Sequence, residues 1–124
     1  MVTSDVAQLS RECNEWRDSL RSFRDEFGHL KGRLQAVAGR QSNKDVLLEI
    51  EHLDNQFHIQ LINIHDLKHS IKSHERLMGM EEANGQITDG SLAAHEDLYN
   101  EFQGLEHTLQ ELREEFAQFI GHIR

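Results

Sequence analysis

The stretch VAQLSRECNEWRDSLRSFRDEFGHLKGRLQAV, residues 6–37, carries apolar side chains at steps that alternate between three and four residues without interruption. This spacing places an apolar residue on the same helical face at every turn and is the a/d pattern of a coiled-coil helix. The run stops before Gly39, which is typical of a helix C-terminus. We therefore predict a helix over about residues 4–38. Its single apolar stripe consists of Val6, Leu9, Cys13, Trp16, Leu20, Phe23, Phe27, Leu30, Leu34 and Val37.

Two later segments repeat the same alternation and predict helices over about residues 44–78 and 91–123. Ser42 with Asp45 forms a predicted capping box before the second helix, Gly79 is its predicted end, and Ser91 is the predicted cap of the third. The glycine-rich stretch 79–90 has no period and is predicted to be a loop. The second stripe is Val46, Ile50, Leu53, Phe57, Gln60, Ile64, Leu67, Ile71, His74 and Met78, and the third is His95, Leu98, Phe102, Leu105, Leu109, Leu112, Phe116, Phe119 and Ile123.

The predicted fold class is all-α. Short connections make neighbouring helices antiparallel, and each helix has one apolar stripe to bury. The chain of 124 residues contains no proline, so long helices can run unbroken. We therefore predict a single domain, residues 1–124, folded as an antiparallel three-helix coiled-coil bundle with up-down-up topology that can dimerise.

Composition restricts the classes of partner. The net charge of −9 argues against nucleic acid and against an anionic membrane surface. No apolar run is long enough to span a bilayer, and residues 1–13 lack the features of a signal peptide. The single cysteine, Cys13, cannot close an intrachain disulfide. We therefore expect a cytoplasmic location, no nucleic acid and no membrane. The acidic third helix is read as a solvated face, with docking of a basic protein partner as the alternative.

Two resemblances accompany this pattern. Trp16 in the first stripe makes the architecture resemble the spectrin-repeat type of triple helix, although the second tryptophan expected late in such repeats is missing. The stretch NQFHIQLINIHDLKHSIKSHER, residues 55–76, resembles a recurring pattern in short, uncharacterised all-helical bacterial proteins. This second resemblance covers about the first two helices. It implies a bacterial helical bundle and brings no known activity.

The second helix carries apolar residues that its stripe does not use. Leu47 and Leu61 flank the stripe, whereas others lie opposite it among histidines, and such a face is typical of a partner surface. We predict a homodimer interface there, with a wider core stripe as the alternative. The pair His65 and His69, four residues apart, is an alternative metal site. The predicted interface residues are Leu48, His52, His58, Ile59, Ile62, His65 and His69.

Three residues whose side chains can bind a metal or take part in catalysis occupy stripe positions. Antiparallel pairing of the helices places them at similar heights along the bundle axis. Matching Val37 with Val46, and Met78 with Leu92, places His74 near both Cys13 and His95. A hydrogen-bonded histidine layer is the favoured interpretation of this set, ahead of a metal site and of a Cys–His nucleophile pair. Gln60, also in a stripe, is interpreted as a polar residue that sets the register.

The sequence shows no set of nucleophile, base and orienting residue, so we expect no enzymatic activity, and we expect no cofactor. The favoured function is a structural or protein-interaction bundle that self-associates through the second helix. The alternative is a His-rich bundle that binds a metal through Cys13, His74 and His95, or through His65 and His69.

Overall fold

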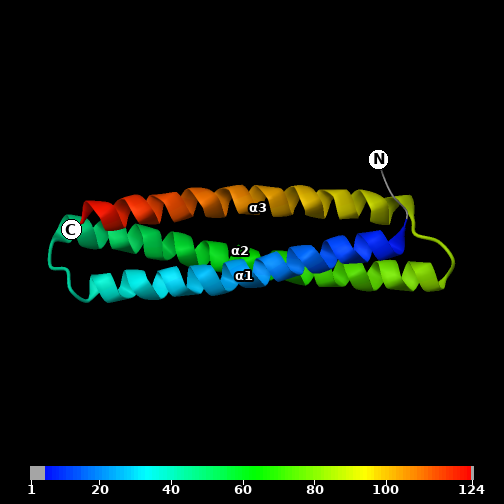
Figure 1. Cartoon of the computed structure of the whole chain (residues 1–124), viewed down its shortest axis with the longest axis horizontal. Coiled ribbons are helices and arrows are strands. Elements are labelled where there is room, and N and C mark those ends of the chain that lie inside the picture. The colour runs from blue at the N-terminus through cyan, green and yellow to red at the C-terminus, as the bar shows by residue number, and fades with distance from the viewer. Residues whose placement is uncertain (1–4, 124) are drawn as a thin grey trace.

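The computed structural model describes residues 5–123 and consists of three long helices connected by short loops (Figure 1). The helices are α1 (Val6–Ala38), α2 (Lys44–Ala83) and α3 (Asp89–His122), and the described residues contain no strand. α1 and α3 run in the same direction, and α2 is antiparallel to both. The predicted all-α, up-down-up three-helix bundle is confirmed. The predicted first helix began near residue 4, which lies outside the described residues.

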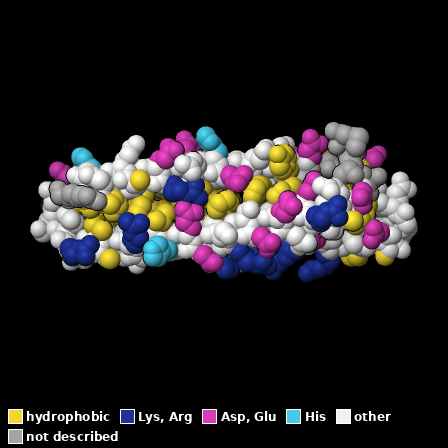
Figure 2. All heavy atoms as spheres, in the orientation of Figure 1, with side chains coloured by type: hydrophobic (Ala, Val, Ile, Leu, Met, Phe, Trp, Pro, Cys, Tyr) yellow, Lys and Arg dark blue, Asp and Glu magenta, His cyan; other side chains and the backbone are white. Residues whose placement is uncertain are grey.

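The core follows the three predicted stripes. Every stripe position is buried or partly buried, and none is exposed. α2 packs closely against both other helices, whereas long aromatic side chains bridge α1 and α3. Trp16 and Phe23 of α1 both stack on Phe102 of α3, with ring centroids 6.2 and 6.4 Å apart. A broken row of hydrophobic side chains shows through along the line between these two helices (Figure 2).

An aromatic layer composed of Phe27, Phe57 and Phe116 takes one residue from each helix. Phe57 is fully buried, and its ring centroid lies 5.9 Å from that of Phe27 and 5.5 Å from that of Phe116. The guanidinium groups of Arg113 and Arg33 each lie 5.3 Å from a ring centroid, over Phe27 and Phe116 respectively. Hydrophobic burial and ring packing hold this layer, and the two guanidinium groups add cation–π contacts over two of its rings.

The prediction that the second helix ends at Gly79 is wrong, because α2 continues to Ala83. A glycine inside a helix costs only about 1 kcal/mol relative to alanine, which packing on either side of Gly79 can offset. Met78 before it is buried, and Ile87 in the loop also enters the core. The connection is therefore shorter than predicted, and its turn uses Gly85 at a φ of +104°, a conformation that suits glycine.

The predicted N-cap is wrong by one residue for α2 and by three residues for α3, whereas Gly39 is confirmed as the C-cap of α1. Asn43, not Ser42, caps α2 by accepting from the backbone N–H groups of residues 45 and 46. Thr88 caps α3, and its hydroxyl accepts from the N–H of Ser91. Ser91 is buried and donates to Glu81 of α2 instead, so this serine ties two helices together.

Candidate functional site

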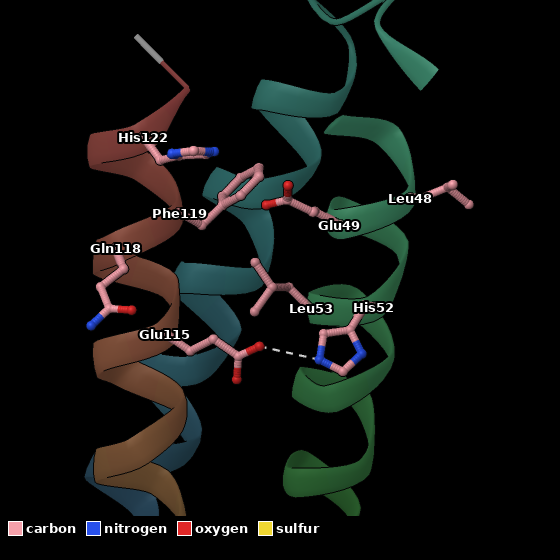
Figure 3. Close-up of a pocket in the computed structure, with 8 residues that line it drawn as sticks. All are labelled: Leu48, Glu49, His52, Leu53, Glu115, Gln118, Phe119 and His122. Carbon is pink, nitrogen blue, oxygen red and sulfur yellow. Dashed lines mark hydrogen bonds and ion pairs between the residues drawn. The ribbon is translucent and has the colours of Figure 1, made fainter. Parts of the chain in front are cut away.

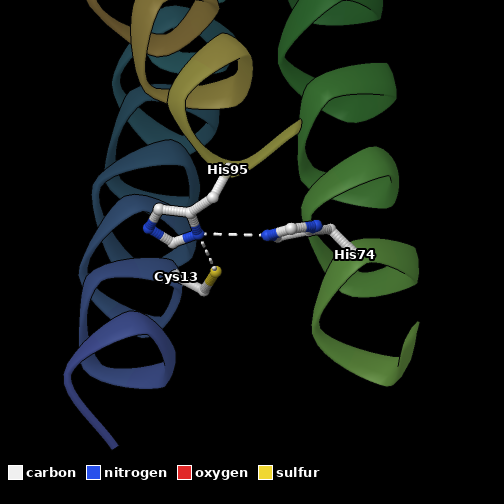
Figure 4. A group of neighbouring side chains, drawn as sticks. All are labelled: Cys13, His74 and His95. Carbon is white, nitrogen blue, oxygen red and sulfur yellow. Dashed lines mark hydrogen bonds between the residues drawn. The ribbon is translucent and has the colours of Figure 1, made fainter. Parts of the chain in front are cut away.

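The Cys–His–His cluster, composed of Cys13, His74 and His95, takes one residue from each helix (Figure 4). The Nε2 atom of His74 lies 3.0 Å from the Nδ1 atom of His95, and the Sγ atom of Cys13 lies 3.9 Å from the same nitrogen. Their potential ligand atoms all lie within 4.8 Å of one another, and all three residues are buried. The structure therefore brings together the three residues that the sequence register placed near one height.

Glu12 extends this cluster. Its Oε1 atom lies 2.8 Å from the Nε2 atom of His95, and its other oxygen accepts from the amide of Gln8 at 3.1 Å. Burial opposes the charge, but these hydrogen bonds hold the pKa of Glu12 below its usual 4.5. An ionised carboxylate can only accept, so His95 in its neutral form carries its proton on Nε2. Its Nδ1 lone pair then points at Cys13 and His74.

The interior strongly disfavours charge on the Cys13 side chain. Burial raises the pKa of the thiol to about 12, and the negative charges of Glu75 and Glu12 add to this increase. Arg17, which forms an ion pair with Glu75 at 2.7 Å, opposes it. Because only the thiolate is a strong nucleophile, this raised pKa opposes nucleophilic attack by Cys13.

His74 and its surroundings favour a neutral imidazole. Burial lowers the pKa of His74 below its ordinary 6.5, the neighbouring His95 lowers it further, and Glu81 partly offsets both effects. The indole of Trp16 packs against His95, with ring centroids 4.8 Å apart. The cluster is thus a polar layer enclosed by an aromatic side chain and by the helices, with both rings positioned by direct contacts.

The outer face of α2, defined here by Leu48, Ile59 and Ile62, is exposed as the sequence pattern placed it. These side chains are 63%, 39% and 46% exposed, respectively. Of the two flanking leucines, Leu61 is partly buried and packs against the core, whereas Leu47 is 37% exposed. Leu61 therefore widens the apolar stripe that faces the core, whereas Leu47 and the outer-face residues are exposed. The histidines among the outer-face residues are all exposed, namely His52, His58, His65 and His69.

A groove of about 500 Å³ between α2 and α3 lies beside the start of this outer face (Figure 3). Leu53 and Phe119 project between the two helices. His52 closes one side through a hydrogen-bond contact between its Nε2 atom and the Oε1 atom of Glu115 at 3.1 Å, and Leu48 points away from α3. Both partners of that pair are about half exposed, so the pair adds little stability. The groove belongs to the same surface as the outer face.

Sequence reasoning missed two functional features. Glu12 lies outside the apolar stripe and was not singled out, although its position next to Cys13 was a signal that it could approach the same layer. Glu81 lies in the predicted loop, yet it accepts hydrogen bonds from Thr88 and Ser91 across the α2–α3 turn. Gln60 is buried as predicted for a register-setting residue, and its side chain accepts from Asn63 at 3.2 Å.

Comparison with known proteins yields no match to a protein family, a curated protein or a solved structure. The resemblance to short bacterial proteins implied an all-helical fold, and the structure confirms it. The bacterial origin that the resemblance also implied stays a prediction. None of the helices among residues 5–123 has the length and apolar character needed to cross a membrane.

Proposed function

We propose that this chain is a non-enzymatic protein-interaction bundle that self-associates through the outer face of α2. The observation that carries the proposal is the exposure of Leu48, Ile59 and Ile62, three large aliphatic side chains on the side of the helix opposite the core. A helix with one buried stripe in a monomeric bundle normally presents polar residues on its opposite side. Apolar residues gathered there are typical of a surface that another protein covers.

A second copy of the chain is the simplest partner for this face. Two-fold pairing of α2 with itself buries the same residues on both chains, at a gain of roughly 25 cal/mol per Å² of apolar surface. Such pairing also keeps the acidic α3 helices of the two chains away from the contact.

The proposal that the chain is not an enzyme is supported by the chemistry of the buried cluster. Cys13 is the nucleophile candidate of that cluster, and its pKa of about 12 keeps it protonated near neutral pH. The neighbouring His95 is hydrogen-bonded to Glu12 and to His74. Catalysis by a thiol requires a lowered pKa and access to substrate, and the burial of Cys13 opposes both.

Analytical ultracentrifugation at tens of micromolar protein and pH 7.5 tests the self-association. We expect a dimer for the natural chain and a monomer for Ile59→Asp combined with Ile62→Asp, because two carboxylates cannot be buried in an apolar contact. The matched control is Asn100→Asp combined with Gln103→Asp, which adds the same charge at the same spacing on exposed positions of α3, away from the outer face of α2. The control should remain dimeric. A monomeric natural chain, or a dimer that survives the isoleucine changes, contradicts the proposal.

The alternative function, a His-rich metal-binding bundle, finds no support at the exposed histidines. His65 and His69 share one face of α2 but belong to no group of three potential ligands among the described residues. Two imidazoles on an exposed helix face make a weak site, since transition metals in proteins need three or four ligands. If this chain has a metal site, the buried Cys–His–His cluster is the place where the donor atoms converge.

A further inference from the structure

We propose that Cys13, His74 and His95 bind one divalent transition metal ion per chain, and that Zn²⁺ matches the cluster best. This inference is independent of the proposed self-association. It departs from the sequence-based expectation of no cofactor, because the structure adds the side-chain distances and a hydrogen-bonded carboxylate that the sequence pattern did not show.

The spacing of the donor atoms approaches that of a tetrahedral site. Zinc lies about 2.3 Å from a thiolate sulfur and about 2.0–2.1 Å from an imidazole nitrogen, which sets the ligand atoms of a tetrahedron about 3.4–3.6 Å apart. The Cys13 sulfur and the His95 nitrogen are 3.9 Å apart, and the two imidazole nitrogens are 3.0 Å apart. Coordination requires changes of about half an ångström in these two distances. The remaining distance, from the Cys13 sulfur to the ligand nitrogen of His74, is at most 4.8 Å and must shorten by up to about 1.2 Å.

The carboxylate of Glu12 orients His95 for this role. Histidine ligands in metal sites almost always donate their second ring N–H to a carboxylate, a carbonyl or water, which fixes the tautomer. Glu12 lies 2.8 Å from the Nε2 atom of His95, and Gln8 holds the carboxylate from the next turn. The lone pair of the other nitrogen, Nδ1, therefore points at the centre of the cluster, as a ligand atom must.

Charge in the vicinity also suits a cation. Glu12 and Glu75 are close enough to disfavour a thiolate, and the same negative charges favour a divalent ion, whereas Arg17, which is paired with Glu75, opposes it. On binding, the S–H bond of Cys13 breaks, a bond forms between sulfur and metal, and the proton passes to solvent. His74 moves its proton from Nε2 to Nδ1, so that Nε2 becomes the ligand. The net reaction releases one proton per metal bound.

A hydrogen-bonded layer alone does not account for the third residue. The bond between His74 and His95 and the bond from His95 to Glu12 already satisfy both ring nitrogens of His95. Cys13 adds only a 3.9 Å contact to a nitrogen that already has a partner. Cys13 fills a buried stripe position of α1, and coordination to a metal gives its sulfur a bonding partner in addition to this packing. The fourth position of the tetrahedron is then left for water, as in zinc sites with three protein ligands.

Titration of tag-free protein with Co²⁺ and Zn²⁺ tests the site directly. We expect one Co²⁺ per chain, with the intense visible bands of tetrahedral cobalt and a near-ultraviolet charge-transfer band from a thiolate ligand. Zn²⁺ should displace the cobalt, and one proton should be released per ion bound. Cys13→Ser should abolish the charge-transfer band, and Glu12→Gln should weaken metal affinity about 10- to 100-fold by removing the orienting carboxylate.

The matched control is His65→Ala combined with His69→Ala, which removes two exposed histidines and should leave the titration unchanged. His74→Ala and His95→Ala are compared by circular dichroism before titration, and Cys13→Ser supplies the decisive readout if either of them unfolds. The proposal is overturned if Co²⁺ binds without a thiolate band, if the band persists in Cys13→Ser, or if the surface control loses binding. Absence of stoichiometric binding overturns it as well.

Discussion

The aromatic layer and the Cys–His–His cluster are built the same way and held by different forces. Each takes one residue from the stripe of each helix. In the aromatic layer, Phe57 touches both partner rings and has no polar group to satisfy. In the cluster, one ring nitrogen of His95 is hydrogen-bonded to His74 and the other to Glu12. One layer needs only volume and burial, whereas the other needs particular atoms at particular distances.

This difference assigns the two layers different tasks. Hydrophobic packing tolerates small rotations and slips of a helix, because apolar contact has little directional preference. A buried polar network loses its partners when the register slips by one turn, and an unsatisfied buried group is costly. The aromatic layer therefore supplies stability, and the cluster supplies specificity for one alignment of the three helices. Three substitutions or titrations separate these contributions.

The largest effect is expected from Phe57→Ala. Phe57 is fully buried at the centre of the aromatic layer, so truncation removes apolar burial and leaves a cavity between three helices. We expect the free energy of unfolding to fall by about 3–5 kcal/mol. Urea denaturation followed by circular dichroism measures this loss. A loss below about 1 kcal/mol would mean that the layer collapses around the gap and does not dominate stability.

A smaller loss, about 1–3 kcal/mol, is expected from His95→Leu in metal-free buffer. Leucine has a similar volume, but it leaves His74 buried without its partner and removes the partner of Glu12. The double change His74→Leu with His95→Leu removes both buried imidazoles and should be less destabilising than His95→Leu alone. The same urea titrations decide this, and additive losses in the double variant would contradict the interpretation of the cluster as one network.

The smallest effect is the pH dependence that His74 contributes. Burial lowers its pKa below 6.5, so the unfolded chain binds this proton more tightly than the folded chain does. The contribution of His74 to stability is therefore complete above pH 6.5 and decreases as the pH falls through that value. Above pH 5 the low pKa values of Glu12 and Glu81 leave these carboxylates ionised.

Urea midpoints of the natural chain, measured in metal-free buffer from pH 7.5 to pH 5, should therefore decrease. The midpoints of His74→Gln should decrease less over the same range, because glutamine does not titrate while the other histidines are unchanged. Equal slopes for the two proteins would show that His74 is protonated as easily in the folded state as in the unfolded state.

The alternation of three and four determined which residues face the core, because the period of an α-helix fixes the direction of each side chain from its position alone. That is why every predicted stripe residue, from Leu9 to Phe119, is buried or partly buried, and why Leu48 and Ile62 face outward. The residues at which the helices begin and end could not be predicted as well from this period. Gly79 and Ser91 carry helix-terminating and capping signals, but contacts of their neighbours across the α2–α3 turn override both.

The register of one helix against another can be estimated from the loops, and it brought Cys13, His74 and His95 to one layer. Only the tertiary structure showed that Glu12 completes this layer and that, of the two flanking leucines, Leu61 packs against the core whereas Leu47 is exposed. The physical reason is that local periodicity encodes the direction of a side chain from its own helix axis. The distance between atoms on different helices depends on how the axes cross and how closely they pack, which the whole set of contacts decides together.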